Sequence, residues 1–413
     1  MKVLVIGGGG REHAIIDAIS KSKQVTKIYA APGNAGIAQL AECLPIKDTD
    51  VDTLVTFAYN HAIDLTVVGP ELALAAGIVD AFEAHGLRIF GPTKAATQIE
   101  SSKQFAKDLM KKYDIPTADY KVFSDYSSAW EYVQTSPMPV VLKYDGLAAG
   151  KGVVIAENLD EANSALKDML QNDKFGHGQV VIEEFMTGPE FSFMCFVSGD
   201  KVYPMVLSQD HKRAFDGDKG PNTGGMGAYS PLPFITKADE EFALQKIMLP
   251  TAKAMIAEGC PFKGVLYGGL MKTPNGIKVV EFNARFGDPE TEVVLPRLTA
   301  DIVDIFTAII DGTTPVLTWD KRAAIGIVLA SKGYPNNYEK GFEIKNLDRV
   351  DTTVYHKGTK RENDKIITNG GRVLFVTALA DTLKEAREKA NAEVAKIDCE
   401  NLFYRTDIGW QAT

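Results

Sequence analysis

The chain has 413 residues, of which 45% are hydrophobic and 24% are charged, so it is long enough for roughly two to four globular domains. This composition excludes a disordered or fibrous protein. The net charge of −9 disfavours a protein that coats nucleic acid, so any phosphate-binding site must be local.

The sequence shows no export signal and no membrane span. The apolar run before Gly7 covers only residues 3–6, whereas a signal peptide needs about 7–15 apolar residues and a spanning helix about 18. The four cysteines lie far apart without metal-ligand spacing, so we expect them to be reduced and buried. We expect a cytoplasmic protein, a monomer or weak dimer, that binds neither nucleic acid nor membranes.

The first 100 residues predict a parallel α/β unit, because short apolar strands alternate with helix-like stretches. The clearest strands are residues 2–7, 26–31, 64–69 and 88–91. Ligands of such sheets lie beyond the carboxyl ends of the strands. Those ends carry residues 7–10, 32–36 and 69–71, which should meet at one crevice.

The glycines at 7–10 follow the first strand and precede a helix. A dinucleotide fingerprint that begins at Gly7 would need glycine at position 12, where Glu12 stands. Glycines let backbone N–H groups approach an anion at a helix N-terminus, so a phosphorylated substrate is the better interpretation. A tight turn that binds nothing is the alternative.

A second unit, residues 101–325, has a mixed α+β pattern with a break at Pro116. A helix is predicted at residues 161–170. The predicted strands are residues 140–143, 153–156, 180–184, 191–197, 201–207 and 278–282.

Residues 143–152 read KYDGLAAGKG and join two of these strands. They are not a P-loop, because the glycine spacing is one residue short and a strand follows instead of a helix. A glycine loop between antiparallel strands can close over the phosphates of ATP, with Lys143 and Lys151 supplying charge. This arrangement is typical of an ATP-grasp enzyme, with a flap subdomain at about 117–184; an ordinary hairpin loop is the alternative.

The strand at 180–184 ends in two acids and is followed by Glu190. Such a junction can present main-chain groups to an adenine ring while Glu190 accepts hydrogen bonds from ribose hydroxyls. Solvated acids at a strand end explain the pattern equally well.

The strand at 278–282 leads into the sequence EFNARFGDPE. Side chains two residues apart share a strand face, so Glu281, Asn283 and Arg285 line up. Two oxygen ligands suit Mg²⁺, and the guanidinium could hold a carboxylate or a phosphoryl group. A solvated strand face with an ion pair is the alternative.

Residues 210–230 are polar and glycine-rich, too long and too polar to form a core. We expect a functional loop here, with a mobile surface loop as the alternative. A small C-terminal α/β domain, residues 326–413, follows. Its predicted elements are strands near residues 325–330 and 372–378 and a helix at 383–396.

Together these motifs resemble the glycinamide ribonucleotide synthetases, which are ATP-grasp ligases of purine biosynthesis. The resemblance spans nearly the whole chain. It rests on GGGGREHA at 7–14, PGNAG at 32–36, VVGPE at 67–71, YDGLAAGKGV at 144–153, DHKR at 210–213, GPNTGGMGAYSP at 220–231 and EFNARFGDPET at 281–291. It implies an ADP-forming ligase that uses ATP and Mg²⁺ or Mn²⁺ to join glycine to 5-phosphoribosylamine through glycyl phosphate.

The resemblance also implies the site residues. Glu281 and Asn283 would hold the metal. The contacts to ATP would come from Lys103, Lys143, Gly146, Gly150, Lys151, Gly152, Glu183, Glu184, Phe185 and Glu190. The two other substrates would bind Gly9, Gly10, Asn34, Glu71, Asp210, Lys212, Gly225, Arg285 and Asp288, and catalysis would rest on Arg285, Asp210 and Lys143.

Two positions depart from what the resemblance leads us to expect. Glu292 stands where we expect glutamine, which leaves the hydrogen bonding of that side chain open. Residues 267–271 lack the metal-binding acid that many ATP-grasp enzymes carry there. Another ATP-grasp carboxylate ligase, such as one that activates bicarbonate, and a non-catalytic nucleotide-binding module are the competing functions.

Overall fold

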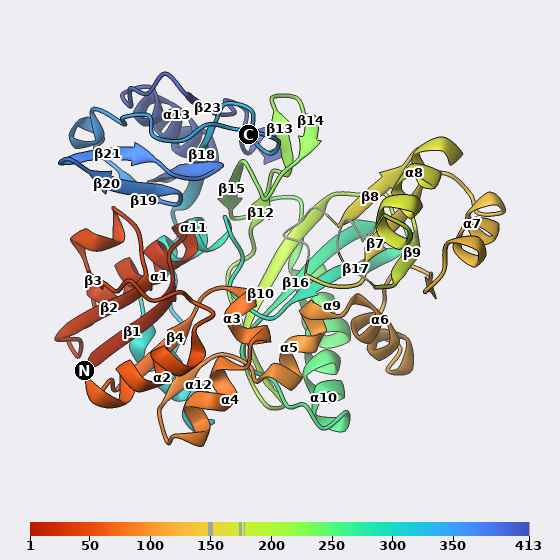
Figure 1. Cartoon of the computed structure of the whole chain (residues 1–413), viewed down its shortest axis with the longest axis horizontal. Coiled ribbons are helices and arrows are strands. Elements are labelled where there is room, and N and C mark those ends of the chain that lie inside the picture. Colours follow the sequence, from red (N-terminus) through yellow and green to blue (C-terminus); the bar gives the residue numbers. More distant parts are fainter. Residues whose placement is uncertain (148–151, 173–175, 177, 413) are drawn as a thin grey trace.

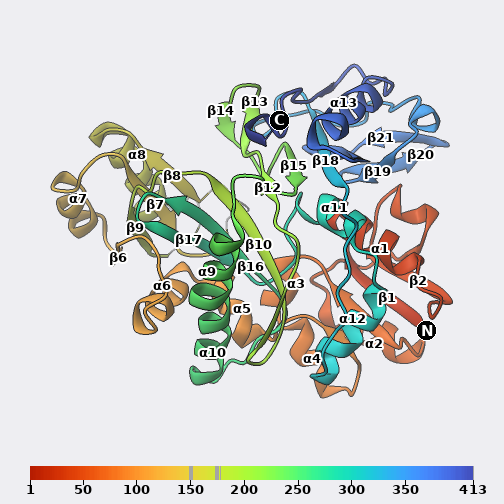
Figure 2. The ribbon, with the colours of Figure 1, turned by 180° about the vertical axis from the view of Figure 1, so that it is seen from behind.

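The structure is a computed structural model of the chain, and it describes residues 1–147, 152–172, 176 and 178–412. The N-terminal and C-terminal units lie next to each other, and a larger central unit adjoins both (Figure 1). The part of the central unit around α7 and α8 projects away from the other two units, as the view from behind also shows (Figure 2). The predicted multidomain α/β and α+β fold class is confirmed.

The N-terminal unit is built on a five-stranded sheet of order β3-β2-β1-β4-β5, in which every pair is parallel, as predicted. The edge strand β3 is only two residues long and was not predicted. The strands are β1 (Lys2–Gly7), β2 (Lys27–Pro32), β3 (Glu42–Cys43), β4 (Leu65–Val68) and β5 (Ile89–Phe90). The helices are α1 (Gly10–Ser20), α2 (Val51–Asn60), α3 (Glu71–Ala75) and α4 (Ile78–Ala84), with a 3₁₀ turn at Ile37–Gln39.

Both faces of β1 are buried, which explains its uninterrupted apolar sequence. Val3 and Val5 pack with residues of α1, whereas Leu4 and Ile6 pack with residues of α2 and α4. The helix α1 begins directly after the strand because the Glu12 carboxylate accepts a hydrogen bond of 2.7 Å from the Gly9 N–H. The glycine segment is thereby fixed at the carboxyl end of β1.

The central unit contains two antiparallel four-stranded sheets, of order β6-β9-β7-β8 and β11-β10-β16-β17. The first consists of β6 (Tyr120–Phe123), β7 (Val140–Tyr144), β8 (Val153–Ala156) and β9 (Val180–Glu184), covered by α7 (Tyr126–Gln134) and α8 (Leu159–Leu170). The second consists of β10 (Glu190–Ser198), β11 (Lys201–Pro204), β16 (Lys263–Thr273) and β17 (Gly276–Asn283). Further helices are α5 (Lys94–Ser101), α6 (Lys103–Lys112), α9 (Lys237–Ala243), α10 (Leu249–Ala257), α11 (Thr291–Val294) and α12 (Ile302–Asp311), with a π-helical turn at Leu244–Met248 and a 3₁₀ turn at Leu295–Arg297.

The strands on either side of the predicted flap form an antiparallel pair, as expected. Lys143 on β7 lies opposite Val153 on β8. Residues 148–151 of the loop between them lie outside the described residues.

The C-terminal sheet has the order β12-β15-β18-β22-β19, with β23 also paired to β18. Its strands are β12 (Gln209–Asp210), β15 (Gly227–Ser230), β18 (Ala323–Ser331), β19 (Thr353–His356), β22 (Arg372–Ala380) and β23 (Leu402–Phe403). Beside it lie α13 (Leu383–Val394), the hairpins β13 (Arg213–Phe215)–β14 (Lys219–Asn222) and β20 (Thr359–Glu362)–β21 (Lys365–Thr368), and 3₁₀ turns at Leu347–Arg349 and Trp410–Ala412.

This sheet corrects the expectation that residues 210–230 form one long functional loop. The segment supplies β12, β15 and the β13–β14 hairpin, and β15 is fully buried against β18. The strand β15 was not predicted, because its segment is rich in glycine and polar residues and its partner β18 lies about 100 residues further along the chain. A domain boundary drawn near residue 326 therefore leaves two strands of the C-terminal sheet in the central segment.

All four cysteines are free, but the expectation that all are buried is wrong for Cys43 and Cys399, which are partly exposed. Within residues 1–147, 152–172 and 178–412, no helix has the length and apolar character needed to cross a membrane.

Candidate active site

A cavity of about 450 Å³ opens where the three units meet. Its walls come from both central sheets, from α1, α3 and α5 of the N-terminal half, and from β22 of the C-terminal sheet. The predicted site residues that line it are Glu71, Lys103, Lys143, Gly146, Gly152, Glu183, Glu184, Phe185, Glu190, Asp210, Lys212, Glu281, Asn283, Arg285 and Asp288.

Other predicted site residues do not line this cavity. Gly9, Gly10, Asn34 and Gly225 are absent from its walls. Gly150 and Lys151 lie outside the described residues.

A chain of buried charges closes one end of the cavity. The Glu183 carboxylate lies 3.0 Å from the Lys143 ammonium and 3.0 Å from the Lys107 ammonium, and all three side chains are at most 5% exposed. Lys143 also donates to the Val280 carbonyl over 2.9 Å. Burial lowers the pKa of Lys107 to about 8, although Glu183 opposes this. Lys107 was not predicted, since one lysine on an amphipathic helix gives no signal of burial.

Lys103 lies at the start of α6, on the side of the cavity that faces the predicted flap. Its backbone N–H donates to Asp145 over 2.5 Å, and its ammonium donates to the Gly146 carbonyl over 2.9 Å. Burial lowers the pKa of Lys103 despite the nearby Glu281. These contacts attach α6 to the beginning of the glycine loop.

The junction between β9 and β10 is partly exposed. Phe185 is 38% exposed, and the Glu184 carboxylate pairs with Lys278 over 2.9 Å. Glu190 at the start of β10 pairs with Lys212 over 2.5 Å. A flat apolar group with polar edges could lie against this junction.

The cavity face of β17 presents the predicted metal ligands. Glu281 and Asn283 line the cavity together with Val280 and Phe282, whereas Val279 lies in the core and is absent from the cavity walls. Although burial alone would raise it, the pKa of Glu281 is lowered by Lys212, Lys143 and Lys103. The Glu281 carboxylate accepts no hydrogen bond from any described residue, so its oxygens are available to a cation.

The strand beside β17 adds no carboxylate at this point. Gly269 on β16 lies opposite Glu281, and Tyr267 lies opposite Asn283. Among the described residues there is no group of three or more His, Cys, Asp or Glu side chains that could hold a metal by themselves. Glu281 and Asn283 fit a hard cation whose other ligands are phosphate oxygens and water.

Arg285 is held by two acids of the N-terminal half. Its guanidinium lies 3.0 Å from Glu100 and 3.5 Å from Glu71. Glu100 also accepts a 2.7 Å hydrogen bond from the Ala284 N–H. Glu100 was not among the predicted residues, yet it fixes both the strand end and the arginine.

Asp210 lies on β12 with acids and a lysine around it. Burial raises the pKa of Asp210 to about 7, with Lys212 acting against this and Glu290 and Glu190 adding to it. Glu290 also lines the cavity and accepts hydrogen bonds from Ser192 over 2.9 Å and from Tyr267 over 2.8 Å. A carboxyl that titrates near neutral pH can accept or donate a proton.

The glycine segment at 7–10 is packed tightly from several sides. Side chains at positions 7 and 69 would collide with Glu12, and one at position 10 would collide with Glu292 and Lys357. Gly7 also adopts a φ of +118°, which favours glycine. Packing therefore accounts for part of this glycine pattern.

Asn34 uses its polar atoms within the fold. Its amide nitrogen donates to the Gly8 and His356 carbonyls over 2.9 and 2.8 Å, and its oxygen accepts from two backbone N–H groups of the same turn. This side chain therefore connects the glycine segment to the C-terminal unit.

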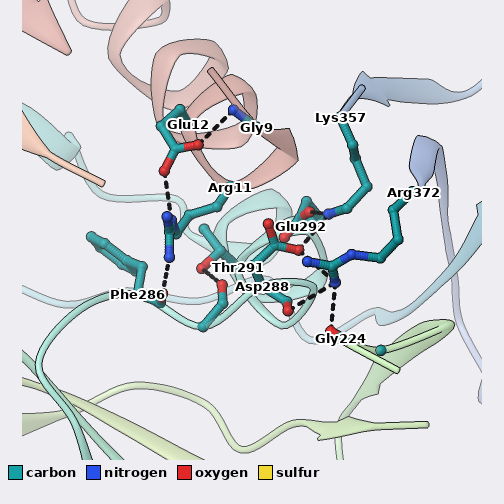
Figure 3. Close-up of polar contacts among 12 residues, drawn as sticks. Gly9, Arg11, Glu12, Gly224, Phe286, Asp288, Thr291, Glu292, Lys357 and Arg372 are labelled. Carbon is teal, nitrogen blue, oxygen red and sulfur yellow. Dashed lines mark hydrogen bonds and ion pairs between the residues drawn. The ribbon is translucent and has the colours of Figure 1, made fainter. Parts of the chain in front are cut away.

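A cluster of charges joins all three units beside the glycine segment (Figure 3). One Asp288 oxygen lies 2.5 Å from the Lys357 ammonium and 3.0 Å from the Arg372 guanidinium. Lys357 also pairs with Glu292, which has no exposed surface. Burial alone would raise the pKa of Asp288, but Arg372, Lys357 and Arg11 together lower it well below its usual range. Lys357 and Arg372 were not predicted, because no local motif marks them.

The chain matches three domain families in order. These are the phosphoribosylglycinamide synthetase N domain over residues 1–100, its ATP-grasp (A) domain over 101–291 and its C domain over 324–411. The chain is 54% identical over 416 residues to a phosphoribosylamine–glycine ligase of Halalkalibacterium halodurans, covering 100% of this chain and 97% of the relative. It is 50% identical over 419 residues to the enzyme of that name from Listeria monocytogenes, and each chain is covered completely.

Solved structures show the same architecture. The crystal structure of phosphoribosylamine–glycine ligase from Thermotoga maritima has a TM-score of 0.88 and 33% identity, covering 99% of this chain and 100% of the other. A biotin carboxylase from Campylobacter jejuni has a TM-score of 0.76 at 14% identity, covering 99% and 94%, and this likeness shows the fold alone.

Proposed function

Because the chain belongs to the phosphoribosylglycinamide synthetase family, we propose that its cavity is where ATP activates glycine and where 5-phosphoribosylamine then receives the glycyl group. The chain is an ATP-dependent ligase of purine biosynthesis. Its reaction gives glycinamide ribonucleotide, ADP and phosphate. The carboxylate of glycine is a poor electrophile, and its phosphorylation by ATP creates a good leaving group.

We assign the end of the cavity at β7, β9 and α6 to ATP. The charges of Lys103 and Lys143 suit the phosphates, and the partly exposed junction at Glu184 and Phe185 suits adenine. Because Glu183 holds Lys143 on one side, the ammonium is placed before the nucleotide arrives. Glu190 is our candidate for the ribose hydroxyls.

ATP-grasp ligases use a divalent metal, and we propose Mg²⁺, with Mn²⁺ as a substitute, at Glu281 and Asn283. The metal would neutralise phosphate charge during phosphoryl transfer. Support comes from the half-buried Glu281 carboxylate, which accepts no hydrogen bond within the described chain, and from the hard oxygen donors that this strand offers.

We assign the middle of the cavity to glycine. Arg285, held by Glu71 and Glu100, can bind the carboxylate and later the acyl phosphate. Asp210 faces the same space and can pair with the ammonium group of glycine. Catalysis is then mainly positioning and charge neutralisation.

We assign the end beside the glycine segment to 5-phosphoribosylamine. Its amine attacks the carbonyl carbon of glycyl phosphate, the C–N bond forms, and phosphate leaves with the bonding electrons of the C–O bond. The attacking nitrogen loses one proton in this step, which the released phosphate takes up. Gly9 lies near Asp288, and Glu71, which also lines the cavity, lies near both Arg11 and Arg285.

One observation carries this assignment: a single cavity runs from Lys143 and Glu281 past Arg285 to Asp288. Nucleotide, acid and amine can therefore meet within one cavity. We also propose a monomer or weak dimer. We propose the cytoplasm as its location, in keeping with the four free cysteines.

The test is ADP release by the purified chain with ATP, Mg²⁺, glycine and phosphoribosylamine formed from ribose 5-phosphate and ammonia. We expect ADP release that requires both glycine and the amine, with glycinamide ribonucleotide detected by mass spectrometry. ADP release with bicarbonate but none with glycine would contradict the assignment.

A further inference from the structure

The C-terminal unit supplies two cations to one oxygen of Asp288. The Oδ1 atom receives the Lys357 ammonium at 2.5 Å and the Arg372 guanidinium at 3.0 Å (Figure 3). Asp288 is only 17% exposed, and it lines the cavity beside Arg11 and Glu71. Two cations on one oxygen fix both the place and the rotation of the carboxylate.

The other oxygen of Asp288 points toward the glycine segment. A Cβ atom placed on Gly9 would lie 3.7 Å from Oδ2. No residue in the described part of the chain donates a hydrogen bond to Oδ2, and the surrounding cations keep the carboxylate ionised by lowering its pKa. Oδ2 is therefore a hydrogen-bond acceptor and a poor proton acceptor.

Lys357 is itself held rigidly. Its side chain is 4% exposed, and its ammonium lies 5.4 Å from the centre of the Phe375 ring. Its second carboxylate partner, Glu292, is completely buried, and the Oε2 atom of Glu292 has no hydrogen-bond partner among the described residues. The Glu292 carbonyl accepts a 2.9 Å hydrogen bond from Thr377, on the same strand as Arg372.

Glu292 balances the excess positive charge. Lys357 and Arg372 share the single acid Asp288, whereas Arg11 pairs with Glu12 and Glu71, and a buried cation without a counter-ion is strongly unfavourable. Burial raises the pKa of Glu292 to about 7 and Lys357 acts against this, so Glu292 supplies the second negative charge above neutral pH, and it does not reach the cavity. Its place next to Gly10 also keeps it against the glycine segment.

We propose that Lys357 and Arg372 are positioning residues that hold Asp288 Oδ1, so that Asp288 Oδ2 accepts a hydrogen bond from the amino group of phosphoribosylamine, with Glu292 balancing the charge of Lys357. The proposal rests on the function given above. It makes the amine-binding end incomplete until the C-terminal unit is in place. The nucleotide end does not depend on these cations.

A purely structural role for Lys357 gives different results. If Lys357 served only as the counter-ion of Glu292, its loss would lower stability but leave substrate binding unchanged. If it acts through Asp288, its loss weakens binding of the amine alone. A double-mutant cycle with Glu292 separates these two roles.

The experiment measures KM for ATP, glycine and phosphoribosylamine in wild type, Lys357→Met, Glu292→Gln and the double variant. We expect Lys357→Met to raise KM for phosphoribosylamine about tenfold, whether or not the Glu292→Gln change is also present, because one charged hydrogen bond to Asp288 is lost. KM for ATP and for glycine should stay within about twofold. Lys365→Met, which removes an exposed lysine that pairs with Glu343, is the matched control and should change none of the three constants.

Because Lys357 is buried, thermal melting of each variant must show that it is folded at the assay temperature. Arg372→Gln removes the other cation that contacts Asp288 Oδ1, from a side chain that is 20% exposed. This change should also raise KM for phosphoribosylamine. Unchanged KM for phosphoribosylamine in folded Lys357→Met and Arg372→Gln would overturn the proposal, as would an equal rise for all three substrates. A wild-type chain without glycine-dependent ADP release would instead refute the proposed function.

Discussion

The two ends of the cavity hold their charges in different ways. At the nucleotide end, Lys107, Glu183 and Lys143 come from neighbouring elements of the central unit, and nearly all of their surface is buried. At the amine end, Asp288 is held by Lys357 and Arg372 of another unit, at the place where three units meet. The first arrangement depends on one fold, and the second depends on how separate units dock.

The two ends of the cavity should therefore respond differently when their charged residues are replaced. Charges within one unit are in place whenever that unit is folded, so their disruption should be seen as lost stability. Charges shared between units are in place only after docking, so their disruption should be seen as weaker binding of one substrate or as sensitivity to solution conditions.

The largest effect should come from Glu183→Gln at the nucleotide end. The variant leaves two buried lysines without their common counter-ion, so we expect the free energy of unfolding to fall by about 3–5 kcal/mol. Urea unfolding followed by circular dichroism measures this. Glu184→Gln is the matched control in the next position, where an exposed pair with Lys278 contributes at most about 1 kcal/mol. Equal losses in the two variants would contradict the comparison.

Glu281→Ala should abolish most turnover while leaving the fold intact. Loss of a metal-binding carboxylate should lower kcat by about 100-fold or more, because phosphate charge is no longer neutralised. The apparent Mg²⁺ affinity should fall as well, measured by titrating Mg²⁺ in the ADP-release assay. Glu388→Ala, on the exposed face of α13, serves as the control. ATP turnover that survives Glu281→Ala would refute the metal site.

A smaller, pH-dependent effect should appear where the N-terminal and C-terminal units dock. The backbone N–H of His356 donates to His13 Nδ1 over 2.9 Å. Burial lowers the pKa of the His13 imidazole to about 4 and that of the His356 imidazole to about 3. In the unfolded chain both histidines take up a proton near pH 6.5, whereas in the folded chain they stay neutral to a lower pH. The stability of the folded chain is therefore complete above pH 6.5 and is lost as the pH falls toward the folded pKa values. By pH 5 the loss should be about 2 kcal/mol for each histidine.

Urea unfolding at a series of pH values from 7.5 to about 5 measures this slope. His13→Asn keeps an acceptor oxygen but cannot become charged, so it should remove about half of the loss between pH 6.5 and 5. A slope as steep as that of wild type would show that His13 does not sense pH at this contact.

Local patterns in the sequence pointed to the end of the cavity that we assign to ATP and the metal. The alternation around Glu281 and Asn283 and the glycine loop between two strands are visible within ten residues, and the strands that carry them are confirmed. The parallel N-terminal sheet was predicted for the same reason. The roles of the residues at this end stay predictions until variants are measured.

The cations at the amine end could not be predicted in the same way. Lys357 meets Glu292 across 65 residues and His356 meets His13 across 343, and such pairs have no spacing that a single sequence reveals. Glu292 stood out as unexpected, but the cation that accounts for it lies in another unit. The strand β15 was missed because its burial depends on β18, whereas the segment that precedes it is polar and rich in glycine.

The strands β12 and β15, which come before the rest of the C-terminal sheet in the chain, also affect which fragments of the chain can fold alone. A fragment that begins near residue 324 would keep β18 but lose β15, its neighbour along Ala324–Ile327. Every residue of β18 is buried in the full chain, so the fragment would expose an apolar edge with unpaired N–H and C=O groups. Other copies of the fragment can pair with such an edge. We therefore expect the fragment to aggregate during expression, although it matches the boundaries of the family's C domain.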